Sequence, residues 1–391
     1  MSSLTQQRDL TDAWNETAAR IDAHDPDGVA EVVRGLDDDE RREVARRLPE
    51  LLRSAAPRGP RPFMGDDAAF RAAGAGTLGG AAAVAAWLNR REFTSRWAGE
   101  HDDTGRLLDL WDDRDDAWRA DLARRLVLRL RSPRHIGLDL ALALLAETGA
   151  EPPEHDPLVV GWVSTAPPRA KDPMLPVLLP RIFEAEGVGR ALRGNTSWLR
   201  TLATLADRGA VDRRALLDGC VRRFLRGGTA TDLRFFVSLH RLLEPADLDA
   251  RRRHVRRHAR DYVRLLPSAP GPVAELAAGL LRELPDLKPE YVVEALDGLL
   301  FRSEVGLVRG GLAWLESTVR RSPELADGCA AALARAFGHT SPGVRRRAVR
   351  LALKLPDTTA PDALRDAVPL LPDDLAAQLT ARYAPPGPPA A

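Results

Sequence analysis

The stretch HTSPGVRRRAVRLALKL, residues 339–355, decides the fold because it predicts a turn followed by an amphipathic helix. Ser341 suits the N-cap of that helix, and Pro342 suits its first position. Apolar residues recur along it at helical spacing, namely Val344, Ala348, Leu351 and Leu355. One face of the predicted helix is therefore apolar, and the other is rich in arginine.

The same pattern recurs upstream, where an apolar residue is followed one or two positions later by a charge. These apolar residues lie at spacings of 40, 35 and 36 and are Leu233, Val273, Val308 and Val344. A second marker repeats independently, because LDGC at residues 217–220 returns as ADGC at residues 326–329, 109 residues later. That distance is three units of about 36 residues, a period typical of stacked helical hairpins of the HEAT or armadillo kind.

The repeat predicts an all-α fold, a right-handed α-solenoid of about nine to ten helical hairpins. Each hairpin in such a solenoid buries its apolar face only against its neighbours. We therefore expect the four helices that carry the repeated apolar residues to be successive layers of one wall.

Composition supports helices and gives little direction on function. Of the 391 residues, 44% are hydrophobic and only 5% aromatic, which suits small-residue helix packing better than a β-sandwich. The formal net charge is +1, so no overall field attracts the chain to nucleic acid or to an anionic membrane. Cys220 and Cys329 lie on apolar helical faces, which indicates buried structural thiols in a reducing compartment and no disulfide framework.

The cytoplasm is the predicted location. The start MSSLTQQRDLTDAW lacks the basic residues and apolar core of a secretory signal. No apolar run approaches the roughly 18 to 20 residues that are needed to cross a bilayer. We therefore expect a soluble protein with no membrane contact.

Three parts are predicted along the chain. Residues 1–55 form an N-terminal helical cap, because the segment at 54–65, SAAPRGPRPFMG, has the prolines and glycines of a connecting loop. Residues 66–383 form the HEAT-like α-solenoid. The Pro-rich tail at residues 384–391 has no apolar face to pack and is predicted to be disordered.

Several phrases carry a resemblance that spans nearly the whole chain. They are GAAAVAAWLNRREF (80–93), DDAWRADLARRL (115–126), GVGRALRG (187–194), LLDGCVRRFLRGG (216–228), ARDYVRLLPSAPGPVAELA (259–277) and ARAFGHTSPGVRRRAVRLALK (334–354). They resemble an uncharacterised actinobacterial family of helical-repeat, HEAT-like domains of unknown function, found near proteins with SWIM-type zinc fingers. The resemblance implies a helical-repeat fold and a protein partner such as a SWIM zinc-finger protein, and it supplies no catalytic residues. The chain resembles the N-terminal part of longer members, so an activity in their C-terminal half is not expected here.

The most strongly charged segment, RRRHVRRHARDYVR at residues 251–264, is the candidate interaction surface. It has seven arginines and two histidines against one aspartate. A single helix here places four residues on an apolar face, Val255, Ala259, Tyr262 and Leu266. The outward row is then Arg252, Arg253, Arg256, Arg257 and Arg260.

Two further arginines, Arg302 and Arg309, are expected to extend this surface into the next repeat. Such a row pairs with an acidic protein surface through forked hydrogen bonds, or with phosphates. The simpler alternative is a solvated face whose arginines bond to neighbouring acids and helix ends.

The leading functional hypothesis is a non-catalytic protein-binding scaffold in a bacterial multi-protein system, with these seven arginines as the binding residues. The alternative is a HEAT-like nucleic-acid-binding protein, similar to DNA glycosylases that use tryptophan and aspartate around a damaged base. The tryptophans stand singly on apolar faces, among them Trp87, Trp111 and Trp314, which favours packing in the core over contact with a base.

The sequence contains no catalytic, metal or cofactor motif. It has no phosphate-binding glycine loop, nucleophile elbow or paired-cysteine motif. His254 and His258 stand four residues apart, but the surrounding arginines are expected to repel a cation, so no zinc site is predicted there. The acidic tract at residues 102–116 lacks the fixed loop that a hard cation needs, and we interpret its acids as helix starts. The balance is against an enzyme, with no cofactor and no metal.

Overall fold

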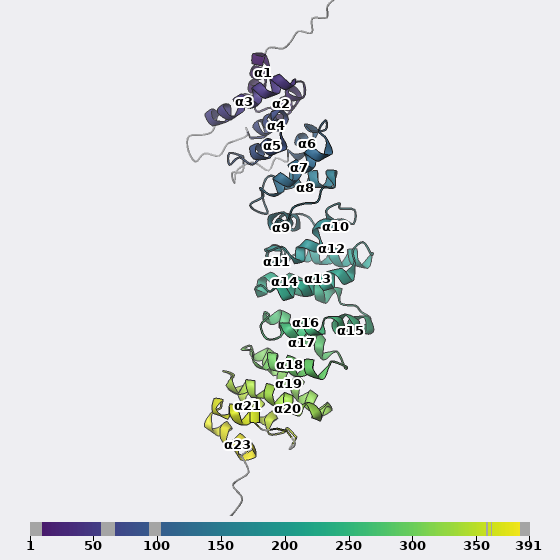
Figure 1. Cartoon of the computed structure of the whole chain (residues 1–391), viewed down its shortest axis with the longest axis vertical. Coiled ribbons are helices and arrows are strands. Elements are labelled where there is room, and N and C mark those ends of the chain that lie inside the picture. The colour runs from purple at the N-terminus through teal and green to yellow at the C-terminus, as the bar shows by residue number, and fades with distance from the viewer. Residues whose placement is uncertain (1–9, 56–66, 94–102, 357–358, 361, 384–391) are drawn as a thin grey trace, which may run out of the picture. The chain divides into compact units, whose positions relative to one another are not determined.

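The computed structural model shows a helical chain and describes residues 10–55, 67–93, 103–356, 359–360 and 362–383 (Figure 1). Within these residues it contains 23 α-helices, four short 3-10 helices and no strand. The predicted all-α class is therefore confirmed. By their internal contacts the residues form two compact units, Met1–Ala191 and Leu192–Ala391.

The helices of the first unit are α1 Leu10–Asp22, α2 Pro26–Arg34, α3 Asp38–Ala55, α4 Asp67–Thr77, α5 Ala81–Leu88, α6 Thr104–Asp109, α7 Asp116–Val127, α8 Leu138–Thr148, α9 Asp156–Ser164, α10 Leu175–Leu178, η1 Pro180–Phe183 and α11 Val188–Ala191. Both α2 and α3 pack on α4. The predicted cap at residues 1–55 therefore shares its core with the helix that follows it, and the division between units falls after residue 191. Residues 56–66, which contain most of the predicted loop, lie outside the described part, as do residues 384–391 of the predicted tail.

Helix α4 is the most deeply buried element of the first unit. Every residue from Ala69 to Thr77 is buried, and small side chains let neighbouring helices approach closely. A Cβ on Gly74 would lie 2.1 Å from Nε1 of Trp87, so only glycine fits at this position. The indole N–H of Trp87 donates to the carbonyl of Phe70 at 3.0 Å, which fixes α5 against α4.

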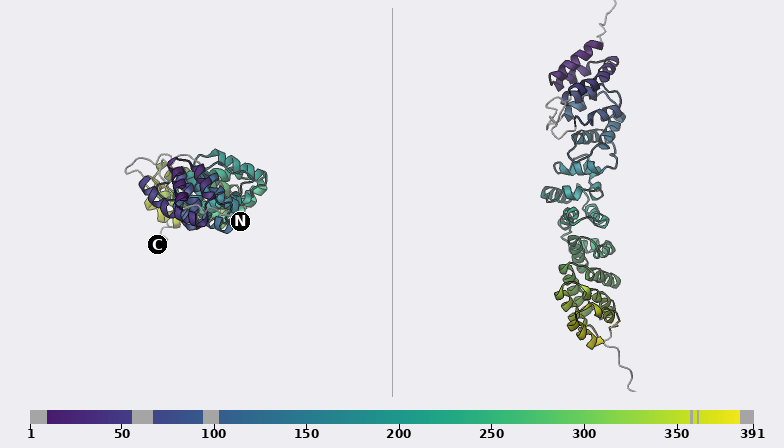
Figure 2. Two further views of the ribbon diagram at one scale, coloured as in Figure 1. Left: turned by 90° about the horizontal axis from the view of Figure 1, so that it is seen from above. Right: turned by 90° about the vertical axis from the view of Figure 1, so that its left-hand side faces the viewer.

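The helices of the second unit are α12 Thr196–Asp207, α13 Arg213–Arg226, α14 Ala230–Leu243, α15 Leu248–Arg257, α16 Ala259–Leu265, α17 Gly271–Arg282, α18 Pro289–Leu300, α19 Val305–Arg321, η2 Pro323–Leu325, α20 Ala326–Arg335, η3 Ala336–Gly338, α21 Pro342–Ala352, α22 Asp362–Ala367, η4 Val368–Leu370 and α23 Asp373–Tyr383. They form two rows in which each helix contacts the next (Figure 2). One row is α14, α17, α19 and α21, and the other is α13, α16, α18 and α20.

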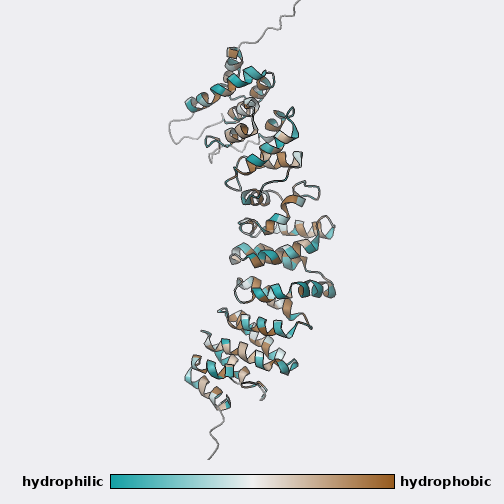
Figure 3. Cartoon of the chain, viewed as in Figure 1, coloured by the Kyte–Doolittle hydropathy of each residue, from teal (hydrophilic) through white to brown (hydrophobic). Residues whose placement is uncertain are grey.

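The first of these rows contains the four helices that the sequence repeat relates. Their repeated residues Leu233, Val273, Val308 and Val344 are all at most 1% exposed. Figure 3 shows both hydrophilic and hydrophobic residues on these helices, as expected for amphipathic helices. The repeat in the sequence therefore marks helices that are successive neighbours in the structure.

The N-terminus of α21 confirms the expected turn. The helix begins at Pro342 with Ser341 as its N-cap residue. The Ser341 side chain makes no capping hydrogen bond; its backbone N–H donates to Nδ1 of His339 at 2.9 Å instead. The histidine thus orders the turn before the helix.

Both cysteines are free and fully buried, which confirms the expected structural thiols. Burial raises the pKa of the Cys329 thiol to about 11 and raises that of Cys220 well above its ordinary value.

Because the thiolate is the reactive species, we expect an aromatic disulfide reagent to label neither cysteine in the native protein at neutral pH. Two thiols per chain should react after denaturation, and rapid labelling of the native chain would contradict the burial of these side chains.

Across the described residues, no helix combines the length and the apolar character that crossing a membrane requires.

Candidate functional site

The basic segment at residues 251–264 is two helices. Helix α15 ends at Arg257 and α16 begins at Ala259, with His258 between them at φ −107° and ψ 14°. The prediction of one continuous helix is therefore wrong. Its apolar face is nevertheless correct, because the four residues assigned to it are at most 5% exposed: Val255, Ala259, Tyr262 and Leu266. The break makes His258 a corner of the backbone.

Most of the outward arginines have acidic neighbours within the second unit. Arg256 donates Nε and Nη2 to the two carboxylate oxygens of Asp286 at 2.9 and 3.0 Å, and these hydrogen bonds lower the pKa of that carboxyl. Longer ion pairs, at 3.9 to 4.0 Å, join Arg252 to Asp249, Arg253 to Asp247 and Arg257 to Asp218. The simpler alternative, arginines bonded to nearby acids, therefore accounts for part of the row.

Arg260 differs from the other members of the row. It is exposed on α16, and no described acid lies within ion-pair distance of it. Arg253 is also exposed, and its one ion pair is 3.9 Å long. These two guanidinium groups therefore give up the fewest existing contacts when they bind a partner.

Arg302 does not belong to an exposed surface. Its side chain is 6% exposed, and Nη1 donates to the carbonyl of Leu266 at 2.7 Å while Nε and Nη2 donate to Glu304. Arg302 therefore connects the start of α19 to the end of α16, and its place in the predicted surface is wrong because its side chain is buried. Arg309, on α19, is exposed as expected.

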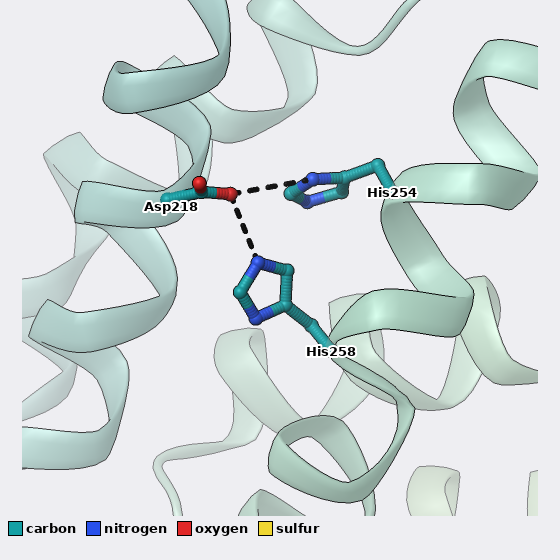
Figure 4. Close-up of side chains that lie close together, drawn as sticks. All are labelled: Asp218, His254 and His258. Carbon is teal, nitrogen blue, oxygen red and sulfur yellow. Dashed lines mark hydrogen bonds and ion pairs between the residues drawn. The ribbon is translucent and has the colours of Figure 1, made fainter.

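Beneath the arginine row, three chemically active side chains converge (Figure 4). Asp218 comes from α13, His254 from α15, and His258 from the corner before α16. Asp218 Oδ1 lies 2.9 Å from His258 Nε2 and 3.7 Å from His254 Nδ1. The three side chains are 22%, 7% and 15% exposed in that order, so the cluster is mostly buried and opens to solvent at Asp218.

Each histidine of the cluster has a second polar neighbour on its other ring nitrogen. His258 Nδ1 lies 3.1 Å from Asp261 Oδ2. His254 Nε2 lies 3.1 Å from the hydroxyl of Tyr262, which is fully buried. A polar group therefore holds the outer nitrogen of each imidazole and fixes the orientation of both rings.

A chain of polar contacts continues inward from Tyr262. Its hydroxyl lies 2.8 Å from Nε2 of the fully buried His240, and His240 Nδ1 lies 3.4 Å from Glu244 Oε1. Glu244 also accepts a 2.6 Å hydrogen bond from Arg251. The chain therefore connects the cluster to a carboxylate at the end of α14.

Burial controls the protonation of this network. It lowers the pKa of His254 to about 4, with smaller contributions from the neighbouring imidazoles of His240 and His258, and it raises the pKa of Tyr262 well above its ordinary value. Burial by itself raises the pKa of Glu244, but contacts with His240 and Arg251 outweigh it, and the net shift is downward. At neutral pH His254 and Tyr262 are therefore neutral, and Glu244 is a carboxylate.

No family model, curated protein or solved structure matches this chain.

Sequence reasoning considered His254 and His258 but missed Asp218. The signal for it is the repeat itself. Asp218 and His258 are 40 residues apart, the same spacing as Leu233 and Val273, which lie on neighbouring helices of the other row. Residues one period apart on α13 and at the α16 corner therefore face each other.

The three tryptophans named for core packing are buried, and Asp115 in the acidic tract begins a helix, as predicted. Trp87, Trp111 and Trp314 are at most 6% exposed and pack in the core, where no base can stack on them. In the acidic tract, Asp115 is the N-cap of α7 and accepts a hydrogen bond from the backbone N–H of Trp118 at 2.7 Å. Among the described residues of that tract, no group of acids converges on a metal position.

Proposed function

We propose that this chain is a non-catalytic protein-binding scaffold built as a right-handed α-solenoid of HEAT/armadillo-like hairpins. The two rows of successively contacting helices in the second unit support this architecture. Repeat proteins of this kind present extended surfaces on which each layer contributes a few side chains. The proposal extends the solenoid over residues 66–383, as the sequence repeat and the family resemblance suggest.

The observation that carries the function is the exposed arginine row of α15 and α16. Arg253, Arg256, Arg257 and Arg260 are exposed within eight residues, while His254 of the same segment is buried and His258 is partly buried. A guanidinium offers a planar fork of donors that matches a carboxylate, and arginine is enriched where interfaces gain most of their energy. The row therefore suits an acidic segment of a partner protein.

The acids within the row favour a protein over a nucleic acid. Asp247, Asp249 and Asp286 all lie within 4 Å of an arginine of the row. Their negative charges repel a phosphate backbone, whereas a protein surface with both signs of charge can complement them. The partner is a cytoplasmic protein, for which the family resemblance suggests a SWIM zinc-finger protein.

A double charge reversal, Arg253→Glu with Arg260→Glu, should weaken capture of the partner by about tenfold or more. Neither arginine makes a close ion pair with another described residue, so stability should stay within about 0.5 kcal/mol of the unmodified chain. Capture is measured by a pull-down from native lysate followed by titration of the identified partner. The matched control is Arg321→Glu with Arg346→Glu, which changes two exposed arginines of α19 and α21 by the same charge.

Three results would count against the scaffold proposal. Equal loss in the control would show that overall charge is responsible, and full capture by the double variant would place the binding surface elsewhere. Retention on duplex DNA at ~0.1 M salt, with affinity that falls steeply as salt rises, would support the nucleic-acid alternative.

A further inference from the structure

The ring of His258 lies between two carboxylates. Its Nδ1 is 3.1 Å from Asp261 Oδ2, and its Nε2 is 2.9 Å from Asp218 Oδ1. A neutral imidazole carries only one proton, so its other nitrogen presents a lone pair to a carboxylate oxygen, which is repulsive. The arrangement therefore calls for a cation at the second nitrogen, either another proton or a metal ion.

The contacts from Glu244 through His240 and Tyr262 determine which ring nitrogen of His254 carries its proton. A neutral His240 ring carries its proton on Nδ1, because that atom faces the Glu244 carboxylate at 3.4 Å. Its Nε2 then accepts the hydrogen bond of the Tyr262 hydroxyl, and the hydroxyl oxygen accepts from His254 Nε2. His254 Nδ1 is left with a lone pair.

That lone pair distinguishes a metal ion from a proton. The side chain of His254 is 7% exposed, and its Nδ1 has no hydrogen-bond partner among the described residues. It lies 3.7 Å from Asp218 Oδ1, so two electron-rich atoms face each other. A second proton on His258 leaves His254 Nδ1 unsatisfied, whereas one metal ion between the three residues satisfies all three atoms.

The spacing of the three atoms fits a tetrahedral metal. In a tetrahedral site, metal–nitrogen and metal–oxygen bonds of about 2.0 to 2.2 Å place neighbouring ligand atoms about 3.3 to 3.6 Å apart. The distance from Asp218 Oδ1 to His254 Nδ1 is 3.7 Å, and all three ligand atoms lie within 4.8 Å of one another. The 2.9 Å distance to His258 Nε2 has to widen by about half an ångström. Rotation of the partly exposed Asp218 carboxylate provides this change.

We propose that Asp218, His254 and His258 bind one divalent transition-metal ion of the zinc type, through Oδ1, Nδ1 and Nε2. Two imidazoles and one carboxylate are ligands that Zn²⁺ accepts, and water takes the fourth position on the exposed side of Asp218. Asp261 and Tyr262 hold the non-ligating nitrogens of the two rings, as outer-shell partners do in zinc sites.

The nearby arginines do not exclude this ion. Arg257 Nη1 is 4.0 Å and Arg214 Nε is 3.7 Å from the Asp218 carboxylate, and their side chains are 40% and 63% exposed. Water screens such exposed charges, and the carboxylates of Asp218, Asp261 and Glu244 supply opposing negative charge. The repulsion expected from the sequence is thus offset by acids that come from other helices.

The bound ion joins parts of the chain that are distant in sequence. It connects α13 to α15 and to the corner before α16, across 40 residues. Binding to the folded state alone raises stability by mass action. The ion therefore stabilises the backbone at His258, between the helices that carry Arg257 and Arg260.

The test is titration of the chelator-treated, tag-free chain with Zn²⁺ alone and with Co²⁺ alone. We expect saturable binding of one ion per chain by calorimetry, a rise in the thermal unfolding midpoint, and a Co²⁺ visible spectrum of four-coordinate type. Asp218→Asn should weaken binding by more than about 100-fold, and the outer-shell change Asp261→Asn by about 10- to 100-fold. Asp297→Asn, which removes an acid from an exposed ion pair on α18, is the matched control and should bind as the unmodified chain does.

Two outcomes would overturn the proposal. Absence of saturable binding by the unmodified chain would mean that a proton serves His258 instead of a metal. Undiminished binding by a folded Asp218→Asn variant would place the ion at another site. If that variant does not fold, X-ray absorption of the loaded unmodified chain decides, because two imidazole ligands are expected and a sulfur ligand or a lack of imidazole contradicts the assignment.

Discussion

Replacing Asp103 with alanine should lower the free energy of unfolding of the first unit by about 3 to 5 kcal/mol, the largest loss that we expect from one substitution. The carboxylate of Asp103 accepts hydrogen bonds from Nε and Nη2 of Arg71 at 2.6 and 3.0 Å. The Arg71 side chain is 2% exposed, and its other contact, with the carbonyl of Leu88, is 3.5 Å long. Without Asp103 a buried guanidinium loses its counter-charge, and water cannot replace it without opening the core.

Two matched variants separate the buried charge from other causes. The double change Arg71→Met with Asp103→Leu removes both charges and should recover much of the loss, because apolar pairs of similar size often replace a buried ion pair without cost. Asp121→Ala breaks an exposed pair with Arg125 and should change stability by no more than about 0.5 kcal/mol. Urea unfolding followed by circular dichroism measures all three. A loss in Asp103→Ala no larger than that in Asp121→Ala would show that the buried pair contributes little.

The helices were predictable because their signals are local. The apolar positions of α21 follow one another at helical spacing, and Pro342 suits only the first turn. The short break between α6 and α7 shows in the acidic run that ends with the Asp115 cap. Neighbouring layers were predictable as well, because a repeat carries each local pattern to the next layer.

The break at His258 was not predictable from its residues. No glycine or proline stands between Arg251 and Arg264, and the apolar spacing continues through the corner. The contacts that accompany the break come from elsewhere in the chain. Asp218 meets His258 from α13, and Tyr262 meets His240 from α14. Tertiary contacts of this kind can override the intrinsic helix propensity of the residues. A prediction from the sequence pattern alone therefore extends the helix past His258.

Only the arginines of the candidate site could be predicted from the sequence, because their partners come from distant parts of the chain. The arginine row could be identified because its residues lie close together in the sequence, but its acidic partners are up to 39 residues away, as Asp218 is from Arg257. Arg302 looked like a surface residue because nothing nearby shows the buried carbonyl of Leu266, 36 residues earlier, that it binds. Charge runs therefore predict where arginines are, and only the fold shows which of them are already paired.

Replacing Tyr262 with phenylalanine should destabilise the metal-free second unit by about 2 to 4 kcal/mol, because two buried nitrogens each lose a partner at about 1 to 2 kcal/mol, the lower part of the range for a buried polar group left unsatisfied. The Tyr262 hydroxyl lies 2.8 Å from His240 Nε2 and 3.1 Å from His254 Nε2. Both imidazoles are at most 7% exposed, so solvent does not reach the nitrogens that the substitution leaves behind. Phenylalanine keeps the ring and its apolar contacts, so the change isolates the hydroxyl.

The matched control for this substitution is Tyr291→Phe on α18, where the ring is partly exposed and removing its hydroxyl should change stability by no more than about 0.5 kcal/mol. Both variants are unfolded in urea with a chelator present, so that a bound metal does not contribute. Equal stability of the two variants would show that the His240–Tyr262–His254 contacts do not hold the corner. A selective loss in Tyr262→Phe would show that this hydroxyl, supplied by α16, joins α14 to α15, because each of those helices contributes one of the histidines.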